Sequence, residues 1–160
     1  MKQGLKLIEK LEALEEEAKI NHFLGMSLWR QDDLESAEVY LNQSIQLLER
    51  IRESAPWTTE MSLVLFDREI ASYQALERIL VLAGRTDEAL LCAEKARSVP
   101  HSNLKKSCDV IRTLDDLLER VNQLRSALLY FSIVGTFLFS WLLIPGRGIS
   151  MHIKYMLQMY

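Results

Sequence analysis

Gly84-Arg85-Thr86-Asp87-Glu88-Ala89-Leu90 is a stretch that predicts a tight turn between two helices. Before it, apolar residues recur at three- and four-residue spacing along one helical face, at Leu76, Ile79, Leu80 and Ala83. Gly84 can take the left-handed conformation that closes a helix. Thr86 is a suitable N-cap for the next helix, and two acidic residues follow where they favour the positive end of the helix dipole. The stretch therefore predicts a helical hairpin.

The second helix of this hairpin carries small residues on one face, at Ala89, Ala93 and Ala96. Small side chains allow two helices to approach closely, so the hairpin is suited to stacking on copies of itself. A copy is found 52 residues upstream, where Leu24-Gly25, Leu28, Asp32, Leu34, Ala37 and Leu41 match Leu76-Glu77, Leu80, Gly84, Thr86, Ala89 and Ala93. We therefore expect two related hairpins.

The two hairpins resemble the tetratricopeptide repeat (TPR), a helix–turn–helix unit of about 34 residues. The second hairpin has the family's marker residues at Tyr73, Leu76, Gly84, Ala89 and Ala96, but Glu77 stands where a small residue is expected. The first has Leu24, Gly25, Ala37 and Ser44, but Asn21 replaces the aromatic residue and Asp32 the glycine. The longer spacing departs from the standard unit and implies lengthened helices. The alternative is a generic helical bundle.

The apolar pattern also indicates where the helices begin and end. The first predicted helix runs from Lys2 to Trp29, either unbroken or interrupted near Glu15-Glu16-Glu17. The third runs from Thr59 to Ala83. Helix caps are expected at Asp32, with Glu35 completing a capping box, at Thr58 and at Thr113.

Residues 127–144 form a run without a charge, which supports two structures. An apolar run of this length is a candidate membrane-spanning helix, flanked here by Arg125 and Arg147. Alternatively, Gly135 turns the chain between two buried strands rich in aromatic residues, and a second turn at Pro145 leads to a third strand at Ile149 to Lys154. The residues alone leave both structures open.

A second resemblance favours the strands. Thr113 through Lys154 is similar to the opening of a CHAT domain, a caspase-related domain that often follows TPR arrays. The similarity covers a helix (TLDDLL), a strand (LLYFSI), a second strand (LFSWLL) and a turn (PGRGI). It implies about three strands. Val99-Pro100-His101-Ser102 departs from the family, which continues here with a helix rich in arginine and alanine.

Composition excludes several classes of protein. The net charge is −3, made up of −5 over the first 126 residues and +2 over residues 127–160, where Arg147 and Lys154 meet no acid. No cluster of lysine and arginine indicates a nucleic-acid partner. Neither cysteine lies in a metal-ligand spacing and no signal peptide is evident, so we expect reduced thiols and a cytoplasmic setting.

We expect no catalytic residue, no cofactor and no metal. The CHAT resemblance implies a catalytic His and Cys on loops late in the domain, and neither position exists in this chain. Cys92 lies among apolar residues of a predicted helix, so a core thiol is the simpler interpretation. Pro145-Gly146-Arg147-Gly148 lacks the lysine of a phosphate-binding loop and indicates a turn.

Binding is therefore the expected function. The TPR resemblance implies that the first helix of each hairpin lines a concave face that receives a protein or peptide. Its positions fall on Lys19, His22, Met26, Trp29 and Arg30 in the first hairpin, and on Ala71, Gln74, Arg78, Val81 and Leu82 in the second. Of these, the candidate groove residues are Lys19, His22, Met26, Trp29, Arg30, Gln74 and Arg78. The cations would attract acidic groups, and Met26 and Trp29 would pack an apolar anchor.

In total, the sequence predicts a mostly α protein: TPR-like helical hairpins (an α-solenoid) over residues 1–100, a connecting amphipathic helix over 101–126 and a truncated CHAT-like β segment over 127–160. The expected function is a non-enzymatic interaction scaffold. The alternative is a tail-anchored membrane adaptor with a transmembrane helix at 127–144. Two hairpins are fewer than a self-standing solenoid needs, so we expect a fragment or a chain that leans on a partner. Self-association through the open sheet edge is a further expectation.

Overall fold

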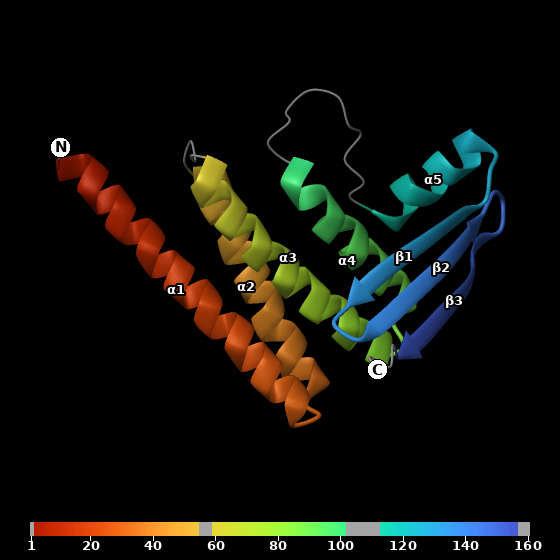
Figure 1. Ribbon diagram of the computed structural model, residues 1–160, viewed down its shortest axis with the longest axis horizontal. Helices are drawn as coiled ribbons and strands as arrows, with labels where there is room; N and C mark the ends of the chain where they lie inside the picture. The colour runs from red at the N-terminus through yellow and green to blue at the C-terminus, as the bar shows by residue number, and fades with distance from the viewer. Residues whose placement is uncertain (1, 55–58, 102–112, 157–160) are drawn as a thin grey trace.

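Helical hairpins lead into a small sheet in the computed structural model (Figure 1). The structure describes residues 2–54, 59–101 and 113–156, with side chains for 8–54, 63–100 and 113–149. Its elements are α1 (Lys2–Arg30), α2 (Leu34–Ser54), α3 (Thr59–Leu82), α4 (Thr86–Ser98), the 3-10 turn η1 (Val99–His101), α5 (Leu114–Leu124), β1 (Leu128–Val134), β2 (Phe137–Ile144) and β3 (Gly148–Met156). The predicted fold class, helical hairpins followed by about three strands, is confirmed.

The two hairpins close in the same way. At the end of α1, the backbone N–H of Asp33 donates to the carbonyl of Leu28 over 3.0 Å. At the end of α3, the backbone N–H of Arg85 donates to the carbonyl of Leu80 over 2.9 Å. The residue before each donor has a positive φ, 66° at Asp32 and 76° at Gly84. Asp32 therefore occupies the left-handed position of a helix end that Gly84 occupies one repeat later.

This geometry corrects two of the expected caps. Asp33, not Asp32, caps α2, because its carboxylate accepts the N–H of Ser36 over 3.1 Å while Asp32 is used to close α1. Thr86 is the first residue of α4, and Arg85 before it makes no side-chain cap bond.

The other expectations about helix ends have mixed outcomes. The capping box of α5 is confirmed, with Thr113 and Asp116 exchanging hydrogen bonds of 2.9 and 3.1 Å. The helix α1 is unbroken at its acidic run. Thr58, Cys108 and the start of the connecting helix lie outside the described residues.

Small residues allow the helices to approach closely. Ala37 and Ala89 are completely buried. A Cβ atom added to Gly25 would lie 2.7 Å from Cγ of Leu41 and 3.1 Å from the carbonyl oxygen of Ala37, so α1 and α2 cross where no side chain fits. The second hairpin has Glu77 at the position of Gly25, and Ala93 replaces the leucine that would obstruct it.

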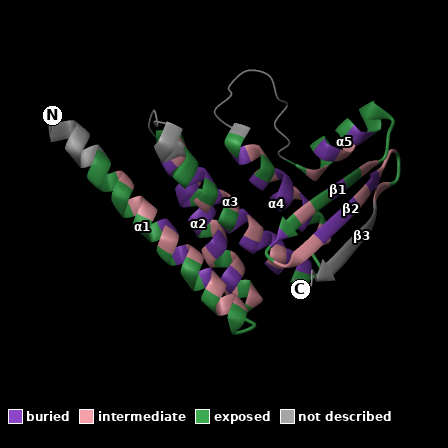
Figure 2. Cartoon of the chain, viewed as in Figure 1, coloured by how far each residue is buried: buried purple, intermediate pink, exposed green. Residues whose placement is uncertain are grey.

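The sheet is antiparallel, in the order β1-β2-β3. A two-residue turn at Gly135 and Thr136 joins β1 to β2, with Gly135 at a φ of 59°. One face of the sheet joins the helical core through Tyr130, Val134, Phe139, Trp141 and Leu143. Figure 2 shows buried residues on the facing sides of the helices and along β2.

Residues 127–144 therefore contain two strands, and the alternative of a transmembrane helix over this run is wrong. A strand pair forms because polar Ser132 and Ser140 and the turn at Gly135 interrupt the apolar run, while alternate side chains reach the helices. Among the described helices, none combines the length and the apolar character needed to cross a bilayer.

Gly25→Ala tests the close approach. We expect it to lower the free energy of unfolding by about 1–3 kcal/mol, because the new methyl group collides with Leu41. In a Leu41→Ala background the two Leu41 contacts are removed and only the Ala37 carbonyl oxygen at 3.1 Å remains, so the same change should cost clearly less, about 1 kcal/mol or below. Urea denaturation followed by circular dichroism measures both. An equal cost in the two backgrounds would contradict the proposed crossing.

Candidate partner-binding face

Three side-chain contacts join α1 to α3, while the backbone of α1 packs mainly against α2. They recur every seven residues on α1, so they lie on one helical face. The three pairs are an ion pair between Glu15 and Arg68, a 3.0 Å hydrogen bond between His22 Nδ1 and Ser72 Oγ, and the Arg78 guanidinium 4.9 Å from the centre of the Trp29 ring. We call this set of contacts the α1–α3 seam.

The middle contact of the seam continues into the core. The hydroxyl of Ser44, on α2, donates to the carbonyl of Ala18 over 2.8 Å, so its oxygen accepts the Ser72 hydroxyl at 3.2 Å. Ser72 in turn accepts the Nδ1–H of His22, because its own proton is already used. Burial lowers the pKa of His22 and so favours the neutral ring, in which this bond places the single proton on Nδ1. His22 is thereby fixed in one orientation.

The C-terminal contact of the seam extends to the sheet. The Arg78 guanidinium lies between two aromatic rings, 4.9 Å from the centre of Trp29 and 5.0 Å from that of Phe137. Its Nη2 donates to the carbonyl of Val134 over 3.2 Å. A Cβ atom on Gly135 would lie 2.9 Å from the same nitrogen. Arg78 therefore joins α1, α3 and the β1–β2 hairpin.

Glu77, the residue before Arg78 on α3, also bonds to the sheet. Its side chain is completely buried, and Oε2 accepts the hydroxyl of Ser132 over 2.8 Å. Its other oxygen, Oε1, has no hydrogen-bond partner among the described residues. Burial raises the pKa of Glu77 to about 7, against the weaker opposing effects of Ser132 and Arg78. Close to neutral pH, this acid is therefore divided between its protonated and charged forms.

Two contacts with α4 complete the attachment of the sheet. The indole N–H of Trp141 donates to the carbonyl of Thr86 over 3.0 Å. The Arg97 guanidinium lies 4.7 Å from the centre of the Tyr130 ring. The inner face of the sheet is thus bonded to both helices of the second hairpin, and its outer face points away from them.

The structure places the predicted groove residues in different environments. His22, Trp29 and Arg78 belong to the seam, Met26 packs against the core, and Lys19 pairs with Glu16. Arg30 is exposed and Gln74 half-buried. Val81, also implied by the resemblance, is 8% exposed and belongs to the core. Arg78 is used in contacts within the chain, whereas Arg30 remains exposed, as expected of a groove residue.

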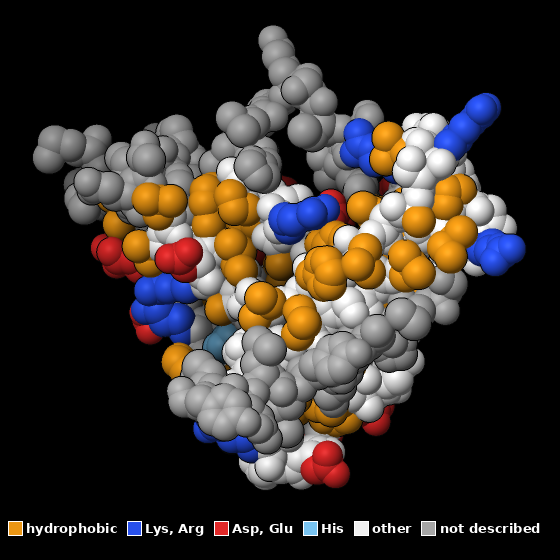
Figure 3. Space-filling view, turned by 45° about the vertical axis from the view of Figure 1, so that its right-hand side comes forward, with side chains coloured by type: hydrophobic (Ala, Val, Ile, Leu, Met, Phe, Trp, Pro, Cys, Tyr) orange, Lys and Arg blue, Asp and Glu red, His pale blue; other side chains and the backbone are white. Residues whose placement is uncertain are grey.

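Sequence reasoning missed the most exposed apolar side chain of this face. Phe23 is 69% exposed and meets the edge of the His22 ring at 5.7 Å between ring centres. Ile8 on α1 and Val64 on α3 are also more than half exposed. Phe23 lies four residues after Lys19 and seven before Arg30, a spacing that would have placed it on the predicted face. In Figure 3, hydrophobic side chains gather across the visible face of the molecule.

Comparisons with known proteins support a relationship to TPR proteins. No protein-family model matches the chain, and no solved structure matches it. Tetratricopeptide repeat protein 28 of Mus musculus and that of Homo sapiens are each 43% identical to the chain over 144 residues. The match covers 84% of this chain and 6% of each relative, so the chain spans a small part of their length.

The buried acid predicts a pH-dependent stability. The folded protein holds the Glu77 proton more tightly than the unfolded chain, where the ordinary pKa is 4.5. The contribution of Glu77 is therefore fully present below about pH 4.5 and is lost as the pH rises towards 7. Relative to Glu77→Gln, the wild type should lose on the order of 3 kcal/mol across this window. Urea denaturation at a series of pH values measures the difference, and parallel curves would contradict it.

Proposed function

The chain is a relative of tetratricopeptide repeat protein 28, and we propose that it is a protein-interaction scaffold that binds its partner on the face of α1 and α3. The observation that carries the proposal is the exposed ring of Phe23, which is 69% exposed on a helix held by the seam. Large aromatic side chains on rigid elements are typical anchors of protein interfaces. The task is recognition, not catalysis.

Rigidity supports this assignment. The α1–α3 seam fixes the helix that carries Phe23 at three levels, with an ion pair, a hydrogen bond and a cation over a ring. Binding of a partner then causes little further loss of conformational entropy at this surface. The contacts that form the seam are internal, so the partner meets the side chains beside them.

Charge and spacing describe the partner. Arg30 is exposed and lies seven residues after Phe23, which is roughly 10 Å along a helix. Among the described residues it forms no ion pair, whereas Lys19 is paired with Glu16. We therefore expect a partner segment with an apolar side chain over Phe23 and a carboxylate near Arg30.

The sheet is part of the same proposal. We assign residues 127–160 to an incomplete CHAT-like tail without catalytic residues. What supports this is the sequence resemblance together with the order of a capped helix, two hairpin strands and a third strand. The tail would extend the scaffold, because its inner face is bonded to the second hairpin.

Affinity capture with matched variants tests the scaffold. Phe23→Glu should remove partners that the wild type retains, because a charge replaces the apolar anchor. Val39→Glu is the control, since Val39 is 49% exposed on α2 and takes no part in the seam. Captured proteins are compared by quantitative mass spectrometry, with circular dichroism confirming the fold. The same proteins captured by all three chains would refute binding at this face.

A further inference from the structure

The outer face of β1 is apolar and uncovered. Leu129, Phe131 and Ile133 alternate along the strand with exposed fractions of 51%, 58% and 61%. Their neighbours point inward, with Tyr130 and Val134 buried and Ser132 bonded to Glu77. On the next strand, Leu138 and Leu142 pair with Ile133 and Leu129 and share the outer face.

The same three residues carry the free backbone edge. A two-residue turn joins β1 to β2, so the residues that flank it, Val134 and Phe137, form a hydrogen-bonded pair. Bonding then alternates along the strand. The N–H and C=O groups of Leu129, Phe131 and Ile133 therefore point away from β2. They offer roughly six hydrogen bonds to a further antiparallel strand.

Nothing within β1 protects this edge. Exposed edge strands are usually guarded by a charge, a proline or a bulge. The sequence of β1 is LLYFSIV, and the irregularity of the sheet lies between β2 and β3, at Leu142 and Leu143. The free stretch ends at Val134, where Arg78 binds the strand to α3.

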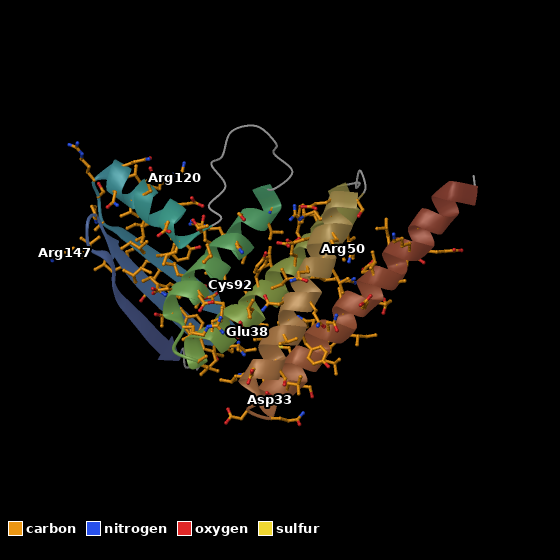
Figure 4. The ribbon with its side chains drawn as sticks, turned by 180° about the vertical axis from the view of Figure 1, so that it is seen from behind. Asp33, Glu38, Arg50, Cys92, Arg120 and Arg147 are labelled. Carbon is orange, nitrogen blue, oxygen red and sulfur yellow. The ribbon has the colours of Figure 1, made fainter. Side chains whose placement is uncertain are left out.

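Positive charge gathers at the end where β1 begins. Arg125 ends α5 three residues before the strand. The side chain of Asn122 accepts the N–H of Gly146 over 2.7 Å, which holds the β2–β3 turn and its Arg147 next to the end of α5. Both arginines are exposed and form no ion pair with a described residue. Figure 4 shows Arg147 at this end of the sheet.

We propose that β1 accepts an extended segment of another protein as a fourth, antiparallel strand, apolar at alternate residues and acidic at its C-terminal end. The free edge selects an extended backbone, the exposed row of β1 selects apolar side chains on the outer face, and the two arginines select the acid. A helix would cover the apolar row but leave the edge donors and acceptors unused. This surface is separate from the α1–α3 face, so either site can be present without the other.

The test uses a fluorescent probe peptide, seven residues of alternating valine and threonine followed by two aspartates. We expect saturable binding by fluorescence anisotropy, with amide exchange slowed at Leu129, Phe131 and Ile133. A probe methylated on the alternate amide nitrogens that face β1 should not bind. The proposal is overturned if the probe does not bind, if the methylated probe binds equally, or if the three amides remain unprotected.

Variants of the chain locate the site. Phe131→Lys should lower the affinity for the probe by about tenfold or more. Val39→Lys, at an exposed apolar position of α2, should leave that affinity unchanged. The double change Arg125→Glu and Arg147→Glu should lower the affinity for the acidic probe by about tenfold. It should leave the affinity for a probe ending in two threonines unchanged. Equal affinities across these chains would overturn the proposal. Sedimentation velocity provides a further check. If the chain forms a dimer that Phe131→Lys dissociates but that the probe cannot dissociate, a second copy occupies the edge and the proposal is overturned.

Discussion

The guanidinium of Arg78 connects parts of the chain that are distant in sequence. It lies between the rings of Trp29 and Phe137 and donates to the carbonyl of Val134. A cation over an aromatic ring contributes about 0.5–2 kcal/mol, more when it is shielded from water, and here two rings share one cation. With Glu77 bonded to Ser132, α3 supports both the first hairpin and the sheet. The surfaces of the helices and of β1 are therefore held in one arrangement.

In both hairpins, a small residue on one helix lies opposite a larger residue on the other, but the two hairpins place the small residue on opposite helices. In the first, Gly25 allows Leu41 to fill the crossing. In the second, Ala93 stands at the position of Leu41, and Glu77, at the position of Gly25, has a buried side chain that extends to the sheet. A departure from the repeat pattern thus marks the place where the helical array meets a different structure. The carboxyl group is tolerated in the interior because Ser132 donates to it and because burial favours its protonated form.

Local patterns predicted the elements well. The turn at Gly84, the buried alanines Ala37 and Ala89, and the aromatic strands on either side of Gly135 follow from residue spacing and backbone preference. The groove residues were harder to assign, since spacing places Arg78 on a face but does not reveal the phenyl ring and carbonyl that come from residues more than 50 positions later. The cap at Asp33 was missed for a related reason. Asp32 takes a backbone conformation that is rare outside glycine, and this moves the cap by one residue.

Glu77 also restricts how such an array can evolve. A duplicated second hairpin inserted among other repeats would bring a carboxylic acid into the interior with no Ser132 to receive it. The descendant copy would have to exchange the acid for a small residue and restore bulk at Ala93, two coupled steps of which either alone is unfavourable. This hairpin is therefore tied to its place at the boundary, and lineages that lengthen the array should do so by copying the units on its other side.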